Sequence, residues 1–146
     1  QNLQLAFNKQ LRNSDEAVKA IESALTLTGI LDKIDAFPNQ LSGGMAQRVA
    51  IARSLCRKPN LLYMDEPFSA LDALTRQNMQ TELKRIHQKT QCSVVFITHD
   101  VREAVTLADR ILVIENGVFK FEYNVKQSSL TREQLTQTII QQSFNH

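Results

Sequence analysis

Two adjacent carboxylates, Asp65 and Glu66, are the residues of this chain whose types and spacing most clearly suggest chemistry. They follow a run of large apolar residues at positions 61–64, and Pro67 ends the run. A continuous apolar run of this length predicts a strand buried on both faces, as in a parallel sheet covered by helices. Open α/β sheets bind their ligands at the carboxyl ends of the strands. Asp65 could therefore hold a metal ion there, and Glu66 could orient a water molecule.

A second stretch with chemical character is Ser42-Gly43-Gly44, which opens a helical pattern that continues to about residue 56. Ser42 can cap this helix, but each glycine in a first turn costs about 1 kcal/mol relative to alanine. That cost is offset where bare backbone N–H groups must approach a phosphate closely. The stretch therefore favours an anion-contacting helix N-terminus over a simple structural cap.

His99 follows a second apolar strand pattern, which covers residues 93–97. Between the two strands, Asp72 is a good N-cap for a helix over residues 73–89. A strand, a helix and a second strand predict a βαβ unit with parallel strands and a right-handed crossover. Glu66 and His99 are then expected at the same edge of one sheet. The alternative for a lone histidine is a surface or helix-capping role.

Other local signals predict the elements around these residues. Ser14 marks a helix start and Gly29 marks its end. Asp100 with Glu103 resembles a capping box that opens another helix, and Asn116 followed by glycine is the strongest hairpin signal in the chain. The remaining expected elements are a helical turn within residues 30–36, strands over residues 110–115 and 118–123, and a helix over residues 131–143.

The composition is that of an ordinary globular domain, with 146 residues, 42% hydrophobic and 22% charged. The net charge of +2 gives no argument for a nucleic-acid partner, and no apolar run is long enough to cross a bilayer. Cys56 and Cys92 lack CxxC spacing, so we expect two reduced, buried thiols rather than a disulfide or a metal site. Because the chain starts at Gln1, without a secretory signal, we expect it to be a piece of a longer protein.

Four motifs in order give the chain a resemblance to the nucleotide-binding subunit of ATP-binding cassette (ABC) transporters, over about residues 30 to 120. Residues 41–45 resemble the signature motif, with Met45 where glutamine is commoner. Residues 61–66 resemble the Walker B strand and its catalytic glutamate, residues 69–72 resemble the D-loop, and His99 resembles the switch histidine. Within the family, residues 72–76 and 103–105 are similar to those of importers of nitrate, sulfonate, taurine or bicarbonate.

The resemblance implies an α/β fold of the P-loop NTPase type, with a parallel sheet flanked by helices and a C-terminal β-hairpin and helix. We expect residues 1–58 to form the remainder of a helical subdomain and the signature helix. Residues 59–123 are expected to form the C-terminal half of the ATPase core, and residues 124–146 a connector and a last helix.

The resemblance also implies roles for the residues already singled out. Asp65 would hold Mg²⁺, Glu66 would act as general base toward the γ-phosphate of ATP, and His99 would contact that phosphate and the attacking water. The residues that would contact a nucleotide held by a second nucleotide-binding subunit are Ser42, Gly43, Gly44, Met45 and Asp72. The implied partners are this second subunit and a transmembrane permease, with the protein peripheral on the cytoplasmic face of the membrane.

The sequence departs from the family pattern in its phosphate-binding loop. A P-loop needs GxxxxGK[ST], but this chain has glycines only at positions 29, 43, 44 and 117, and none precedes a lysine. We therefore expect the chain alone neither to bind ATP tightly nor to hydrolyse it. Two alternatives remain open: a soluble cassette ATPase acting on ribosomes or DNA, and a module that only pairs with a complete cassette.

Overall fold

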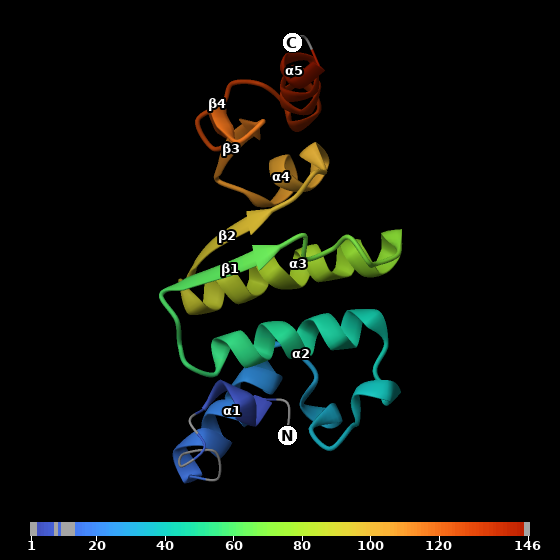
Figure 1. Cartoon of the computed structure of the whole chain (residues 1–146), viewed down its shortest axis with the longest axis vertical. Coiled ribbons are helices and arrows are strands. Elements are labelled where there is room, and N and C mark those ends of the chain that lie inside the picture. Colours follow the sequence, from blue (N-terminus) through green and yellow to red (C-terminus); the bar gives the residue numbers. More distant parts are fainter. Residues whose placement is uncertain (1–2, 8, 10–13, 145–146) are drawn as a thin grey trace. The chain divides into compact units, whose positions relative to one another are not determined.

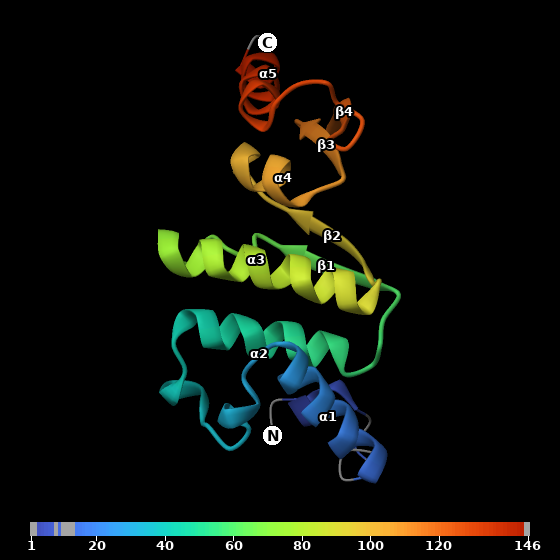
Figure 2. The same cartoon turned by 180° about the vertical axis from the view of Figure 1, so that it is seen from behind.

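The computed structural model describes residues 3–7, 9 and 14–144. They divide into two compact units, Gln1–Ile97 and Thr98–His146. The first unit holds most of the helices and one pair of strands, and the second holds a hairpin between two helices (Figures 1 and 2). Within the described residues, each helix is too short or too polar to cross a lipid bilayer.

The first unit begins with a short 3-10 turn, Leu3–Ala6, and the helix α1, Asp15–Leu27. Ser14 caps α1 as predicted, because its Oγ accepts a hydrogen bond from the backbone of the first turn. The helix is terminated just before Gly29, whose φ of +67° is the left-handed conformation that glycine adopts without strain. The N–H of Ile30 reaches back over this turn to a carbonyl of α1, so the end is a Schellman motif.

Two arginines satisfy the last carbonyls of α1. Arg48 donates from Nη1 to the carbonyl oxygen of Thr28 at 2.9 Å. Arg85 donates to the carbonyl of Leu27 and also pairs with Glu82. These carbonyls have no partners within the helix and carry its negative dipole end, so guanidinium groups are suitable caps. Arg48 therefore has a structural role at the end of α1.

Two short 3-10 turns, Leu31–Lys33 and Pro38–Gln40, lead from α1 to the helix α2, Gly43–Leu55. The long helix α3, Ala73–Thr90, ends at Gln91 in the left-handed conformation. An apolar stripe of α3 is buried, since its members are at most 4% exposed. The members of this stripe are Met79, Leu83 and Ile86.

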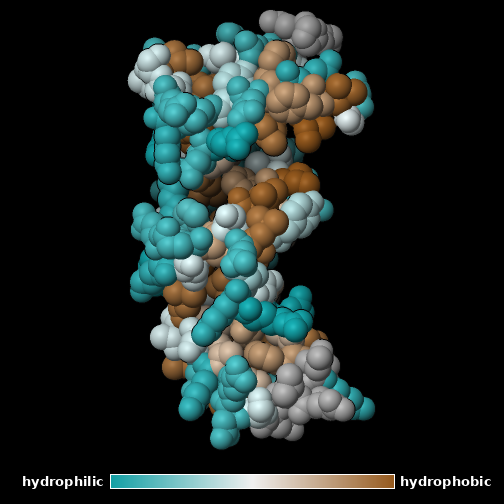
Figure 3. All heavy atoms as spheres, turned by 90° about the vertical axis from the view of Figure 1, so that its left-hand side faces the viewer, coloured by the Kyte–Doolittle hydropathy of each residue, from teal (hydrophilic) through white to brown (hydrophobic). Residues whose placement is uncertain are grey.

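The strands β1, Leu61–Asp65, and β2, Ser93–Ile97, pair in parallel, as the βαβ pattern predicts. The prediction that these strands are buried on both faces is wrong. Leu62 and Met64 are buried, but Leu61 and Tyr63 are 56% and 60% exposed. Both faces of a strand are buried only when other layers lie on both sides of its sheet. Here α3 lies along one face of the strand pair (Figure 1). Figure 3 shows a brown, apolar surface over β1 and β2 in the middle of the view.

The second unit consists of α4, Val101–Leu107, β3, Arg110–Glu115, β4, Val118–Asn124, and α5, Arg132–Phe144. The strands form an antiparallel hairpin with an irregular register next to Val113. The predicted turn is confirmed, because Asn116 and Gly117 both have positive φ, as a type I′ turn requires. The core of this unit is a cluster of buried side chains contributed by Val105, Ile111, Leu135 and Ile139.

Candidate functional site

Asp65 and Glu66 lie where the sequence predicts, at the carboxyl end of a parallel strand pair. Asp65 is the last residue of β1 and is paired in register with Ile97, the last residue of β2. Both carboxylate residues are exposed. The structure therefore presents two adjacent acids to solvent at the sheet edge where α/β proteins bind their ligands.

The backbone of Glu66 is held in a conformation that glutamate rarely adopts. Its φ is +42°, in the left-handed region, where a residue with a Cβ is strained. Three hydrogen bonds fix it: the Glu66 N–H donates to the carbonyl of Ile97 at 2.9 Å, and the N–H and Oγ of Ser69 donate to the Glu66 carbonyl at 3.2 and 3.0 Å. Backbone strain of this kind persists where the surroundings over-determine it, and it clusters at functional sites.

The N-terminus of α2 carries the glycine pair. Ser42 Oγ accepts a hydrogen bond from the N–H of Met45 at 3.3 Å, so the predicted cap is confirmed. A Cβ added to Gly43 would meet a leucine methyl at 3.6 Å, an ordinary contact, whereas a Cβ added to Gly44 would lie 2.7 Å from Thr75 Cγ2. Gly44 therefore has a packing reason to be glycine that the sequence does not reveal, and Gly43 has none among the described residues.

Asp72 performs the predicted capping of α3. Its Oδ1 accepts a hydrogen bond from the N–H of Thr75 at 3.0 Å. A hydrogen bond with the side chain of Thr75, followed by the bond from its N–H, holds the pKa of the Asp72 carboxyl below its ordinary value. Arg76 donates to the carbonyl of Leu71 at 3.1 Å and so ties the first turn of α3 to the preceding loop.

His99 belongs to the second unit and lies just before α4. The residues on either side of it are joined by two hydrogen bonds. The Asp100 N–H donates to Thr98 Oγ1 at 3.0 Å, and the Thr98 hydroxyl donates to the buried carboxylate of Glu103 at 2.8 Å. Asp100 Oδ1 accepts from the N–H of Arg102 at 2.8 Å, which confirms Asp100 as the cap of α4. His99 is exposed, and its juxtaposition with Glu66 stays a prediction.

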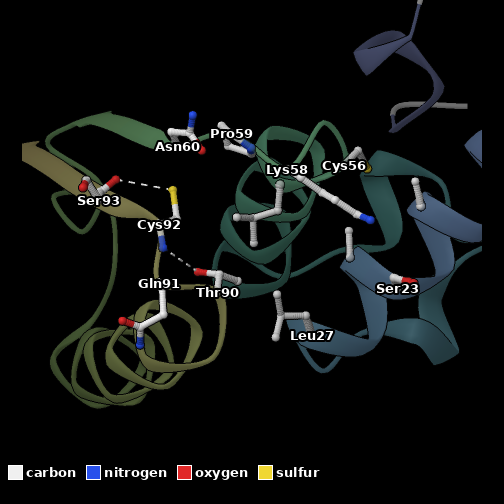
Figure 4. Close-up of a pocket in the computed structure, with 13 residues that line it drawn as sticks. Ser23, Leu27, Cys56, Lys58, Pro59, Asn60, Thr90, Gln91, Cys92 and Ser93 are labelled. Carbon is white, nitrogen blue, oxygen red and sulfur yellow. Dashed lines mark hydrogen bonds between the residues drawn. The ribbon is translucent and has the colours of Figure 1, made fainter.

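A hollow of the first unit lies away from these residues. It has a volume of about 580 Å³ and is lined where α2 and α3 end and where β1 and β2 begin (Figure 4). Cys56 and Cys92 line it, both as free thiols. Burial raises the pKa of both thiols, which favours their protonated form. A smaller hollow of about 130 Å³ between α2 and β1 does include Asp65 in its lining.

The carboxylates at the end of β1 suit one mode of metal binding better than another. Among the described residues, no group of three or more histidine, cysteine or acidic side chains is close enough to form a cage. Mg²⁺ at nucleotide sites needs no such cage, because one or two carboxylates hold it together with water and phosphate oxygens. A single exposed carboxylate such as that of Asp65 suits that mode of binding.

Comparison with known proteins places these features in a family. The family model described as ABC transporter matches residues 1–69. The chain is 50% identical over 124 residues to the aliphatic sulfonates import ATP-binding protein SsuB 1 of Paracoccus denitrificans, covering 85% of this chain and 49% of that protein. It is 49% identical over 119 residues to the nitrate import ATP-binding protein NrtC of Synechococcus elongatus, covering 80% of this chain and 18% of that protein.

Solved structures show the same relationship. The chain is similar to cbiO1 of Clostridium perfringens, part of the ABC transporter complex cbiONQ, with a TM-score of 0.70, 29% identity and coverage of 75% of this chain and 44% of that one. It is also similar to an ATP-binding cassette solved as a dimer bound to ADP and Pi, with a TM-score of 0.61, 31% identity and coverage of 82% and 49%. The chain spans about half the length of the sulfonate relative and less of the nitrate relative. With its signature-like helix start and its paired acids at a strand end, the chain belongs to the ABC transporter family, as part of an ATP-binding subunit.

Proposed function

We propose that this chain is the C-terminal part of the ATP-hydrolysing subunit of an ABC importer for small anions of the sulfonate, nitrate, taurine or bicarbonate kind. The observation that carries the proposal is Glu66, an exposed acid beside Asp65, held in strained backbone at the carboxyl end of a parallel strand pair. The similarity to sulfonate and nitrate import proteins supports the transport assignment.

The roles of the two acids follow from their positions. The Glu66 carboxylate accepts a proton from the water that attacks the γ-phosphate, and its fixed backbone limits how far the side chain can drift from that water. Asp65 would hold Mg²⁺, which when bound offsets negative charge on the phosphates. His99 is proposed to contact the γ-phosphate and to keep the attacking water in place.

The helix start at Ser42 serves a different nucleotide. We assign to Ser42, Gly43 and Gly44 the contact with ATP held by a second subunit, because the first N–H groups of a helix have no partners within it and attract anions. Met45 is assigned no side-chain contact, because its thioether offers no strong donor. Asp72 is proposed to contact the second subunit close by.

The proposed permease contact lies between α1 and α2. Three large apolar side chains in this segment are exposed, which suits a surface that receives a helix from a membrane partner. Phe37 is the most exposed of them, at 65%, and the other two are Leu31 and Ile34. Such contacts would place the subunit peripherally, on the cytoplasmic face of the membrane.

The 146 residues by themselves are proposed to be inactive, because they carry no GxxxxGK[ST] loop to cradle the phosphates. Titration calorimetry of this chain with Mg-ATP tests that proposal. The expected result is no measurable heat of binding at micromolar concentrations, and micromolar affinity would refute it.

The catalytic assignment is tested in the complete subunit by Glu66→Gln. This change keeps the size of the side chain and removes the base, so turnover should fall by roughly a hundredfold or more while ATP binding is retained. Glu22→Gln is the matched control, because Glu22 is an exposed glutamate on α1. Undiminished turnover of the Glu66→Gln subunit would refute the role of Glu66.

A further inference from the structure

The start of α2 and the start of α3 approach each other too closely for any side chain at Gly44. A Cβ at this position would lie 2.7 Å from Thr75 Cγ2, a separation that real Cβ atoms essentially never show. Gly44 is buried although it occupies the first turn of its helix. The backbone of α2 therefore rests directly against the methyl group of Thr75.

Thr75 is also the residue that joins this contact to the preceding loop. Its N–H donates to Asp72 Oδ1, the cap of α3. Leu71, just before this cap, is 9% exposed and lies opposite Gly43, at 3.6 Å from an added Cβ. The segments 42–44 and 71–75 are thus packed against each other through the side-chain methyl groups of Leu71 and Thr75 and the bare backbone of the two glycines.

We propose that Thr75 is a positioning residue. By contact, its methyl group fixes the position of the Ser42–Gly44 segment relative to the start of α3, which Asp72 caps. This inference rests on the proposed function, in which segment 42–44 and Asp72 both face the second subunit. It makes these two groups one rigid body, so that neither can be displaced without the other. A methyl group missing from Thr75 would leave the backbone of segment 42–44 free to shift into the gap.

The first test measures this coupling without nucleotide. Thr75→Ser deletes Cγ2 and keeps the hydroxyl group, while Thr75→Val keeps the methyl group and replaces the hydroxyl group, which hydrogen-bonds the Asp72 carboxylate. Hydrogen exchange should be followed at the amides of Met45 and Ala46, which donate to Ser42 Oγ and to the Ser42 carbonyl. We expect exchange about fivefold faster in Thr75→Ser and unchanged in Thr75→Val.

Thr81→Ser is the matched control, because Thr81 is an exposed threonine of α3 whose hydroxyl group bonds within its own helix. The proposal predicts unchanged exchange at Met45 and Ala46 in this variant. Equal exchange in Thr75→Ser and Thr81→Ser would overturn the proposal, and this result would not bear on whether the protein hydrolyses ATP.

The second test is a rescue experiment in the complete subunit. Gly44→Ala introduces the clash and should lower kcat/KM for ATP by roughly tenfold or more, and Thr75→Ser in the same chain should recover most of that loss by making room. Loss of activity without recovery, in a double variant whose thermal unfolding is normal, would show that Gly44 is needed by the nucleotide and would overturn the proposal. Absence of turnover in the unmodified subunit would instead refute the proposed function, and the exchange experiment would still decide the role of Thr75.

Discussion

The strained backbone at Glu66 makes a prediction about stability that is independent of catalysis. At φ +42°, a residue with a Cβ suffers a steric penalty of about 1–2 kcal/mol, which glycine avoids. Glycine in turn loses more backbone entropy on folding, by about 0.5–1 kcal/mol relative to alanine. The difference predicts that Glu66→Gly is more stable than Glu66→Ala by about 0.5–1 kcal/mol, although both remove the same carboxylate.

The comparison needs a position where the order reverses. Glu22 is an exposed residue within α1, where the backbone is right-handed and helical. At this position the free energy of unfolding of Glu22→Gly should be lower than that of Glu22→Ala by about 1 kcal/mol. Opposite signs at the two positions would identify the backbone conformation, rather than the loss of a glutamate, as the cause.

Urea denaturation, followed by far-UV circular dichroism, measures the free energy of unfolding of the glycine and alanine variants at both positions. The two variants of a pair can be compared when their unfolding free energies depend on urea concentration with the same slope. Glu66→Gly should also have no ATPase activity in the complete subunit, so that a gain in stability over alanine comes with no gain in function. If Glu66→Ala proves equal to or more stable than Glu66→Gly, the strain assigned to this residue is absent and the reasoning fails.

Three further predictions concern other parts of the chain. Gly29→Ala should lower the free energy of unfolding by more than Gly117→Ala, as urea denaturation would show, because both positions have positive φ but only Gly29 has Arg48 at 3.2 Å from an added Cβ. Asp72→Asn should remove part of the acid sensitivity: a lowered folded-state pKa means that ionised Asp72 stabilises the protein above about pH 4 and that this stability is lost as the pH falls further, so thermal unfolding between pH 5 and pH 3 should change less in the variant. Phe37→Ala in the complete transporter should lower transport while leaving the ATPase activity of the isolated subunit unchanged; equal losses of both would contradict a permease contact at Phe37.

The parts of the fold that sequence predicts are those decided by nearby residues. Ser14, Ser42 and Asp72 each cap a helix through a bond to the third residue along the chain. The turn at Asn116 and Gly117 is likewise set by residues that tolerate positive φ. Such contacts can be read from spacing alone, which is why the order and type of the main elements could be predicted.

The errors and omissions concern contacts between distant parts of the chain. An apolar run cannot tell a strand covered on both faces from one covered on a single face, so the exposure of Tyr63 was not predictable. Gly44 meets Thr75 across 31 positions of sequence, and the bond of Arg85 to the end of α1 spans 58. The positive φ of Glu66 has no signal in residue type, because glutamate is not among the residues that favour it.

The central claim is that the residues around Glu66 and those around Ser42 belong to different ATP sites of one dimer. ATPase activity of mixed dimers of the complete subunit tests it directly. A dimer of one Glu66→Gln subunit and one Ser42→Arg subunit should keep one intact site and hydrolyse ATP at a measurable rate. A dimer that carries both substitutions in one subunit, paired with an unmodified partner, should have two damaged sites and no turnover. The reverse pattern, with activity only when both substitutions share a subunit, would contradict the account.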